Sequence, residues 1–259
     1  MTLTLEWLTG TMPLHGAEAF RPLRVGWFGY DPLVIYKEAE PGGPLFDYAK
    51  RILEHAGMTP QYHEVSIKRS LEELRNKRLD MVLTLFKTPE RESFVHFSER
   101  PLLSVGSGFC ARFDIRKKPL KVSSRLAHVS GTVIPVALKG MVQLPVSGND
   151  AQIRMLQLMQ TGRVDLIYNP KPEILIVAAR LAHISIKLHC YELKNSKMPI
   201  YFGFSRDLPI EITQRIEESL KKALQKESFD QYLKKRWAKA GIAYPSVSLI
   251  GPSHLPARP

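Results

Sequence analysis

One arginine in the sequence has the chemistry and the setting of a ligand anchor. Arg91 lies in the polar loop that follows the apolar run at residues 81–83. A planar guanidinium presents paired N–H donors that match the two oxygens of a carboxylate, and a dry cleft strengthens this contact. The alternative is an exposed arginine that pairs with Glu90, Glu92 or Glu99. We interpret Arg91 as the residue that binds an anionic group.

Two further features could complete such a site. Trp27, Phe28 and Tyr30 lie at the end of a short apolar run, where an aromatic ring stacked on a ligand contributes about 0.5–1.5 kcal/mol beyond burial. Neighbouring strand residues point to opposite faces, so at most one of Trp27 and Phe28 can face a ligand, and we expect the loop residue Tyr30 to do so. Arg69 could be a second cation near the site or an exposed arginine at a helix start.

Catalytic and metal-binding patterns are absent from the sequence. It has no Gly-x-Ser-x-Gly turn, no phosphate loop, no GxGxxG and no His-Glu-x-x-His. Glu173 and His128 are the titratable residues near the expected loops of the second half, and neither belongs to a recognisable catalytic set. We therefore expect no catalytic residue, no metal and no cofactor.

The elements that would position these residues alternate between strands and helices. Short apolar runs at residues 23–28, 61–65 and 81–83 predict strands, and helical spacing at 45–56 and 70–74 predicts helices between them. This order predicts a mostly parallel sheet with helices on its faces.

The second half of the chain repeats this order. Arg163-Val164-Asp165 follows a helix at 150–160 and precedes an apolar strand, as Arg78-Leu79-Asp80 does before residues 81–83. The repetition suggests two similar lobes whose strands end at a shared crevice. Strands at 184–191 and 199–204 and helices at 207–224 and 229–237 complete the prediction.

The composition is that of an ordinary globular protein with an excess of basic residues. The 259 residues carry a formal net charge of +12, and the pI is about 9.7. The Lys and Arg residues are dispersed, and no zinc finger, basic zipper or RNA-recognition motif is present, so we expect no nucleic-acid partner. The charge instead favours an acidic ligand or an anionic surface. No apolar run approaches the roughly 18 residues that a membrane span needs.

Two short features leave alternatives open. Ala17-Glu18-Ala19 fits the small-x-small rule of signal-peptide cleavage, so residues 1–20 are interpreted as the remnant of a signal peptide, and a disordered cytosolic leader is the alternative. Cys110 and Cys190 could form one disulfide in an oxidising compartment or remain two buried thiols.

Residues 79–102 resemble the bacterial extracellular solute-binding proteins of the polar amino-acid receptor type (family 3). The strand after Asp80 is followed by Thr88-Pro89-Glu90-Arg91, then Phe97-Ser98 and Pro101-Leu102, in the order and spacing of the family's T-x-E-R, F-S and P-hydrophobic motifs. Ser130-Gly131-Thr132 is similar to the family's x-G-T. The resemblance extends over residues 22–240.

This resemblance implies a periplasmic-binding-protein-like α/β fold, with two lobes of mixed or parallel sheets joined by a two-strand hinge. Residues 21–104 with 205–250 would form the first lobe, residues 107–203 the second, and residues 251–259 a tail. The chain would cross between the lobes near residues 104–108 and again near residues 202–206.

The resemblance also implies which residues bind. In the family, the arginine that matches Arg91 binds the ligand carboxylate. Thr84 and Phe86 stand where a ligand-facing hydroxyl is common; Phe86 departs from that pattern, and the Thr84 hydroxyl could instead bond its own backbone. Ser130 and Thr132 would act as hydrogen-bond donors from the second lobe, or form an ordinary turn.

Asn169 marks a second departure from the family pattern. Receptors for α-amino acids usually have an aspartate here, which holds the ammonium group, and a neutral amide cannot neutralise a buried ammonium. We therefore expect Asn169 to line a site for a ligand with a carboxylate or another anionic group, rather than for a standard α-amino acid.

These observations predict a monomeric, non-enzymatic periplasmic protein that binds a small organic acid or amino-acid-like ligand and delivers it to an ABC-type membrane permease. A ligand sensor for a membrane signalling partner is the closest alternative, since both would close a hinge on the ligand. A dehydratase-like enzyme on the same fold is less favoured, because no general acid or base is recognised.

Overall fold

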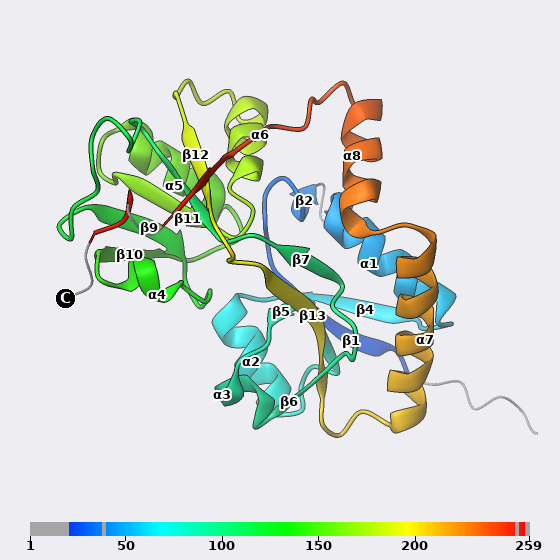
Figure 1. The fold of residues 1–259 in the computed structure, drawn as a ribbon. Helices are drawn as coiled ribbons and strands as arrows, with labels where there is room; N and C mark the ends of the chain where they lie inside the picture. Colours follow the sequence, from blue (N-terminus) through cyan, green and yellow to red (C-terminus); the bar gives the residue numbers. More distant parts are fainter. Residues whose placement is uncertain (1–20, 38–39, 252–253, 257–259) are drawn as a thin grey trace, which may run out of the picture.

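Two α/β lobes, each built on a six-stranded sheet, make up the molecule. The computed structural model describes residues 21–37, 40–251 and 254–256, so the expected leader at residues 1–20 lies outside the described residues. The lobes lie side by side and are connected by long, nearly straight segments of chain (Figure 1). The predicted architecture, two α/β lobes with mixed sheets, is confirmed.

The first lobe has a mixed sheet in the order β4-β1-β5-β13-β6, with β7 paired to β13. Its strands are β1 (Leu23–Trp27), β4 (Pro60–Glu64), β5 (Met81–Phe86), β6 (Val95–Phe97), β7 (Leu103–Val105) and β13 (Met198–Ser205). β1 is parallel to β4 and β5, whereas β13 is antiparallel to β5, β6 and β7. The other elements are the hairpin of β2 (Ile35–Lys37) and β3 (Glu40–Gly42) and the helices α1 (Pro44–His55), α2 (Ile67–Arg75), α3 (Pro89–Glu92), α7 (Ile210–Lys226) and α8 (Phe229–Lys239).

Local sequence explains where α1 begins. Gly43 has a φ of 102°, which favours glycine, and its missing Cβ would lie 2.6 Å from the Leu33 carbonyl oxygen. Pro44 follows at the first helical position, where its fixed φ suits the helix and no backbone N–H is needed. The predicted helical face then packs into the core of the first lobe, with Phe46 and Leu53 almost fully buried.

The second lobe repeats this plan with a sheet in the order β10-β9-β11-β8-β12-β14. Its strands are β8 (Gly108–Ala111), β9 (Arg125–Val129), β10 (Val142–Val146), β11 (Leu166–Asn169), β12 (His189–Leu193) and β14 (Ser248–Ile250), and its helices are α4 (Val136–Lys139), α5 (Ala151–Gln160) and α6 (Glu173–Leu181). β9 lies between β10 and β11 in parallel, as β1 lies between β4 and β5 in the first lobe.

The structure corrects the expected lobe boundaries at two segments, β13 and β14. β13 (Met198–Ser205) pairs with β7, β5 and β6 of the first sheet, so the chain returns from the second lobe between β12 and β13, before residues 202–206. β14 pairs in parallel with β12 in the second sheet, although residues 205–250 were expected in the first lobe. A third connection, residues 240–247, therefore joins α8 to the second sheet. Short apolar runs predict strands but do not say which sheet they join.

The two cysteines form a disulfide between neighbouring strands of the second sheet. Cys110 on β8 lies opposite Cys190 on β12 in the antiparallel register, and their Cα atoms are 4.0 Å apart. The bond joins residues 80 positions apart in the sequence, and both cysteines belong to a buried apolar cluster of the lobe. This structure resolves the choice between a bridge and two thiols in favour of the bridge.

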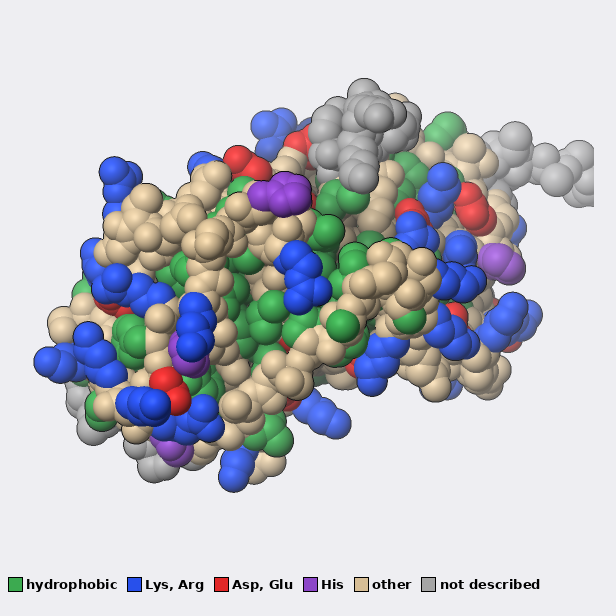
Figure 2. Space-filling model, turned by 90° about the horizontal axis from the view of Figure 1, so that it is seen from above, with side chains coloured by type: hydrophobic (Ala, Val, Ile, Leu, Met, Phe, Trp, Pro, Cys, Tyr) green, Lys and Arg blue, Asp and Glu red, His purple; other side chains and the backbone are tan. Residues whose placement is uncertain are grey.

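Basic side chains are spread over the surface rather than gathered in one place. In Figure 2 Lys and Arg side chains are scattered over the whole face shown, with fewer Asp and Glu side chains among them. Among the described residues, no helix has the length and apolar character required to cross a bilayer.

Candidate functional site

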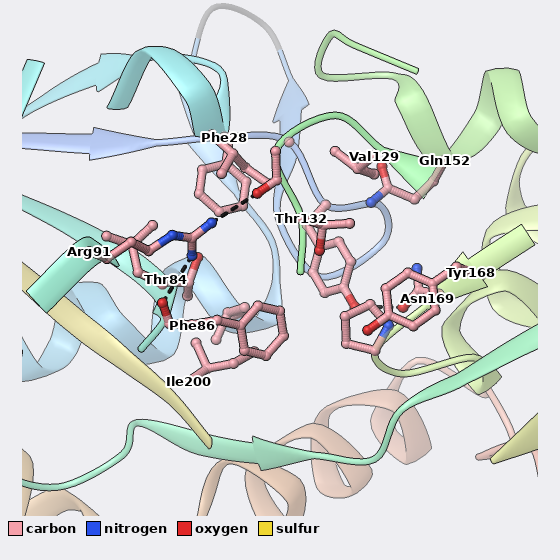
Figure 3. Close-up of a pocket in the computed structure, with 17 residues that line it drawn as sticks. Phe28, Thr84, Phe86, Arg91, Val129, Thr132, Gln152, Tyr168, Asn169 and Ile200 are labelled. Carbon is pink, nitrogen blue, oxygen red and sulfur yellow. Dashed lines mark hydrogen bonds between the residues drawn. The ribbon is translucent and has the colours of Figure 1, made fainter. Parts of the chain in front are cut away.

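A cavity lies between the two lobes and is lined by both of them (Figure 3). The space that the centre of a water molecule can reach is about 60 Å³. The lining is mostly aromatic and aliphatic and consists of Phe28, Gly29, Tyr30, Leu45, Ile67, Thr84, Leu85, Phe86, Arg91, Val129, Gly131, Thr132, Gln152, Tyr168, Asn169, Pro170 and Ile200.

Arg91 is the charged residue of this lining. Its place on the short helix α3 is fixed by Thr88, whose hydroxyl accepts a bond from the Arg91 backbone N–H, and by Pro89 at the helix start. The guanidinium is buried, and it donates from Nη1 to the Phe86 carbonyl and from Nη2 to the Gly131 carbonyl, both at 2.9 Å. Burial lowers the pKa of Arg91 from its ordinary value, and the nearby charge of Glu90 raises it only in part.

The charge on Arg91 is not neutralised within the described part of the chain. No aspartate or glutamate among the described residues forms an ion pair with it, and none lines the cavity. An arginine remains protonated even when its pKa is lowered. The cavity therefore presents a buried positive charge that carbonyl oxygens solvate without cancelling.

Hydrogen bonds across the cleft show that the lobes are closed on each other. Besides the bond from Arg91 to Gly131, the Tyr30 hydroxyl of the first lobe donates to Oδ1 of Asn169 in the second lobe at 2.6 Å. At the rim, the Gly29 backbone N–H donates to Oδ1 of Asn149 at 3.1 Å. Burial raises the pKa of Tyr30 well above its ordinary value, so the hydroxyl remains a neutral donor.

The structure brings most of the predicted site residues together. Tyr30, Thr84, Phe86, Arg91, Thr132 and Asn169 all line the cavity. Thr84 and Phe86 lie two residues apart at the end of β5 and so share one face of that strand. Asn169 does not offer its oxygen to a ligand here, since Oδ1 accepts bonds from Tyr30 and from the Lys171 backbone N–H.

Two predicted residues lie outside this lining. The Arg69 side chain is 70% exposed and pairs with Glu73 on α2, which favours the alternative of a solvated arginine at a helix start. Ser130 lines a second crevice beside the cavity, where Lys68 and Asn149 also lie, and its neighbours Gly131 and Thr132 reach the cavity instead.

Sequence reasoning missed several lining residues. Phe28 is a partial exception, since at most one of Trp27 and Phe28 was expected to face a ligand. Phe28 does line the cavity, whereas Trp27 is buried against Phe46, with 6.1 Å between ring centroids. Val129, Tyr168 and Ile200 complete the apolar wall. The most informative omission is Gln152. It is a polar residue near the start of a helix, and no local feature of the sequence marks it as a site residue.

The titratable residues considered for catalysis lie elsewhere. Glu173 is buried beside Lys171, with 3.1 Å between Oε1 and Nζ, and it accepts a bond from the Tyr244 hydroxyl. His128 faces an adjoining crevice that shares Arg91 and Thr132 with the cavity, and its Nδ1 lies 3.1 Å from the Val129 carbonyl oxygen. No group of three or more His, Cys, Asp or Glu residues in the described ranges could hold a metal ion.

Comparisons with known proteins identify the family and agree with the two-lobe fold. A family model described as bacterial extracellular solute-binding proteins, family 3, matches residues 23–240. No curated protein sequence matches the chain.

Similar solved structures share the fold at low sequence identity. An ancestral arginine-binding protein bound to glutamine has a TM-score of 0.68 and 18% identity, covering 83% of this chain and 96% of its own. The arginine-, lysine-, histidine-binding protein ArtJ from Geobacillus stearothermophilus has a TM-score of 0.69 and 16% identity, covering 87% and 97%. The ancestral amino acid-binding protein AncCDT-1, a precursor of cyclohexadienyl dehydratase, has a TM-score of 0.65 and 20% identity, covering 83% and 94%.

Proposed function

Because the chain belongs to the bacterial extracellular solute-binding proteins, family 3, we propose that it closes its two lobes on a small anionic solute and delivers that solute to an ABC-type membrane transporter. The ligand would enter between the open lobes and be enclosed when they close, with the Tyr30–Asn169 and Gly29–Asn149 bonds across the cleft. Ligand binding to the closed state then shifts the population toward it.

The observation that carries this proposal is the buried, unneutralised guanidinium of Arg91. A carboxylate that replaced the Gly131 carbonyl as its partner would add an ionic, bidentate contact in a desolvated site. Such contacts are about twice as strong as those between neutral groups. An anionic ligand therefore complements this cavity better than a neutral or cationic one.

The lining also indicates the rest of the ligand. Phe28, Phe86 and Ile200 offer an apolar and aromatic surface, which favours a ligand with an aliphatic or ring body. A standard α-amino acid would bring an ammonium group into a cavity whose described lining has no carboxylate, and burying that charge unpaired is costly. We therefore propose an organic acid without an α-ammonium group.

The same features favour binding over catalysis and an extracytoplasmic site of action. The described lining contains no carboxylate or histidine to transfer a proton. The Cys110–Cys190 bond suits an oxidising compartment such as the periplasm. A sensor that reports the solute to a membrane partner would use the same closure. Transport and sensing would then differ only in the membrane protein that the closed form binds.

A thermal-shift screen of the purified protein against organic acids, aromatic acids and amino acids tests this proposal. A ligand present at 100 times its dissociation constant adds about 2.7 kcal/mol of apparent stability. For a chain of this size we expect a rise in Tm of about 5–10 °C. Arg91→Met should abolish the rise, because the apolar side chain fills similar space without the charge.

Arg69→Met is the matched control, since it removes an exposed arginine outside the cavity. It should leave the rise in Tm unchanged. Small-angle scattering with the best acid should show closure as a smaller radius of gyration. A rise that survives in Arg91→Met, or a set of amino acids that outperforms every simple acid, would overturn the proposed anchor and ligand class.

A further inference from the structure

Gln152 has a side chain whose two polar atoms are both buried and unpaired. It is the second residue of α5 and is fully buried. Neither Oε1 nor Nε2 has a hydrogen-bond partner among the described residues. Leaving a buried polar group unpaired costs free energy, so this amide needs a partner that the described residues do not supply.

The unpaired amide lies at the ligand cavity. Gln152 is part of the lining, and Figure 3 shows its side chain reaching from the end of α5 toward the space between the lobes. Arg91 lies on the other side of that space, on the first lobe. The two polar groups thus face one enclosed space from opposite lobes, with apolar residues such as Val129 and Phe28 between them.

We infer that Gln152 is a specificity-determining residue that hydrogen-bonds a second polar group on the ligand, at the end remote from its carboxylate. This inference rests on the proposed function, because it takes Arg91 as the carboxylate anchor. A primary amide offers one acceptor and a two-proton donor, so its complement both donates and accepts. The ligand class is therefore a small monocarboxylate whose apolar or ring body carries a carboxamide, a lactam or a hydroxyl.

A purely structural role would leave a different pattern. If Gln152 only filled space, an aliphatic side chain would fill the same volume without two unsatisfied polar atoms. A structural polar residue would have protein partners, as Asn169 has in Tyr30 and Lys171. Specific sites reject ligands that lack the matching polar group because the group of the protein is then left unpaired.

The first arm of the test uses the protein without ligand. Gln152→Leu keeps the approximate volume and removes both unpaired atoms, so it should raise Tm by a few degrees. Gln157→Leu is the matched control, an exposed glutamine on the same helix, and it should leave Tm nearly unchanged. A Tm for Gln152→Leu that falls below that of the control would assign Gln152 a structural role and overturn the inference.

The second arm uses pairs of acids that differ only in the remote polar group. The pairs are 4-carbamoylbutanoate with 5-methylhexanoate, and 3-hydroxybenzoate with benzoate. In the wild type the polar member of at least one pair should bind about tenfold or more tightly than its partner. Gln152→Leu should remove that preference and leave the affinity for the apolar member unchanged.

The outcomes separate this inference from the proposed function. Arg91→Met should abolish binding of both members of a pair, whereas Gln152→Leu should abolish only the preference. Acids that bind wild type and Gln152→Leu with the same preference would overturn the role of Gln152 and leave the anchor standing. If no acid of the panel binds the wild type, both proposals fail.

Discussion

Among individual side chains, Asp31 carries the clearest pH dependence. It lies in the loop beside Tyr30, and burial raises its pKa from 3.8 to about 6, with repulsion from Asp150 of the second lobe as the lesser cause. A raised pKa means that the folded protein holds this proton more tightly than the unfolded chain. The stability linked to Asp31 is therefore fully present below about pH 4 and is lost as the pH rises toward 6.

Asp31→Asn should consequently stabilise the protein at pH 7 and have no effect near pH 4. We expect a gain of about 1 kcal/mol at pH 7, discounted for partial solvent screening, or a rise in Tm of about 2–4 °C. Thermal melts of both proteins from pH 4 to 7.5 measure this. A constant difference across the range would show that the substitution acts through packing rather than through ionisation.

The sequence identified those site residues whose residue type and position within a motif are both distinctive. Arg91 and Thr84 were found because a strand end and a loop motif mark them, and both line the cavity. Gln152 and Ile67 could not be found in this way. They reach the cavity through the packing of two lobes, and nothing local separates them from other residues at helix starts.

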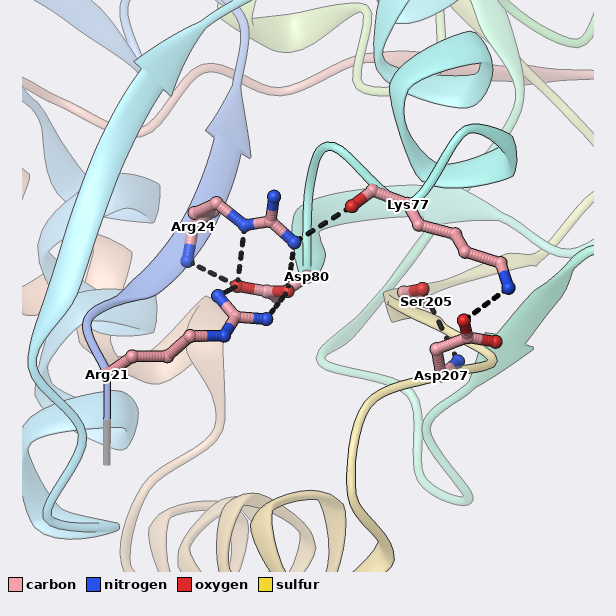
Figure 4. Close-up of polar contacts among 6 residues, drawn as sticks. All are labelled: Arg21, Arg24, Lys77, Asp80, Ser205 and Asp207. Carbon is pink, nitrogen blue, oxygen red and sulfur yellow. Dashed lines mark hydrogen bonds and ion pairs between the residues drawn. The ribbon is translucent and has the colours of Figure 1, made fainter. Parts of the chain in front are cut away.

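Among the strands and helices, one predicted repetition has a structural basis. Asp80, just before β5, accepts bonds from the backbone N–H and the guanidinium of Arg24 on β1. Asp165, just before β11, accepts the same bonds from Arg125 on β9. Figure 4 shows this clamp in the first lobe, where Arg21 adds two further bonds. The basic-x-Asp pattern therefore marks equivalent positions in the two lobes, where an aspartate at the start of one strand binds an arginine of the neighbouring strand.

The contacts of Asp80 with Arg24 and Arg21 also make stability depend on pH. Burial would raise the pKa of Asp80, but hydrogen bonds from Arg24 and Arg21 outweigh it and lower the pKa to about 2. The stabilisation from Asp80 is thus present above about pH 4 and is lost as the pH falls toward 2, the opposite of the behaviour of Asp31.

The contact between two loops across the cleft makes closure sensitive to one glycine. A Cβ on Gly29 would lie 2.2 Å from the backbone oxygen of Asn149 in the second lobe, too close for any side chain. Gly29→Ala should therefore disfavour the closed state and leave each lobe folded. We expect affinity for the acid found in the screen to fall about tenfold or more, in proportion to the lost closed population.

Gly42→Ala is the control for this substitution, because an added Cβ at Gly42 meets no atom within 4 Å. Titration calorimetry gives the affinities, and scattering of the unliganded variants gives the degree of opening. If Gly29→Ala bound the acid as tightly as Gly42→Ala, the loop contact seen here would not belong to the ligand-bound state.

For the molecule as a whole, the lobes are joined by more than the two strands that the sequence predicted. The third connection passes residues 240–247 beside α6, and Ile174 and Val177 of α6 belong to the main apolar core of the first lobe. Lys171 adds a buried ionic contact, with its Nζ 3.1 Å from both Glu173 of its own lobe and Asp230 on α8. We interpret this region as the fixed side of the hinge, where the two lobes stay in contact when the cleft opens. The loops that contain Gly29 and Asn149 lie on the opposite side and would separate.

The ion cluster at this junction predicts unequal effects for its two carboxylates. Burial alone would lower the pKa of Lys171, but Glu173, Tyr244 and Asp230 together raise it, so the ammonium stays charged. The Glu173 side chain is 10% exposed, whereas that of Asp230 is 48% exposed. Glu173→Gln leaves a buried ammonium poorly compensated and should destabilise by about 3 kcal/mol, or about 6–12 °C in Tm.

Asp230→Asn removes a partner that water can replace and should change stability by about 1 kcal/mol or less. The double variant Lys171→Met with Glu173→Gln should recover much of the loss, because no unpaired charge remains buried. Urea titrations of the four proteins measure these differences. Equal losses in the two single variants would mean that solvent reaches Lys171 freely, and the junction could not then act as the fixed side of the hinge.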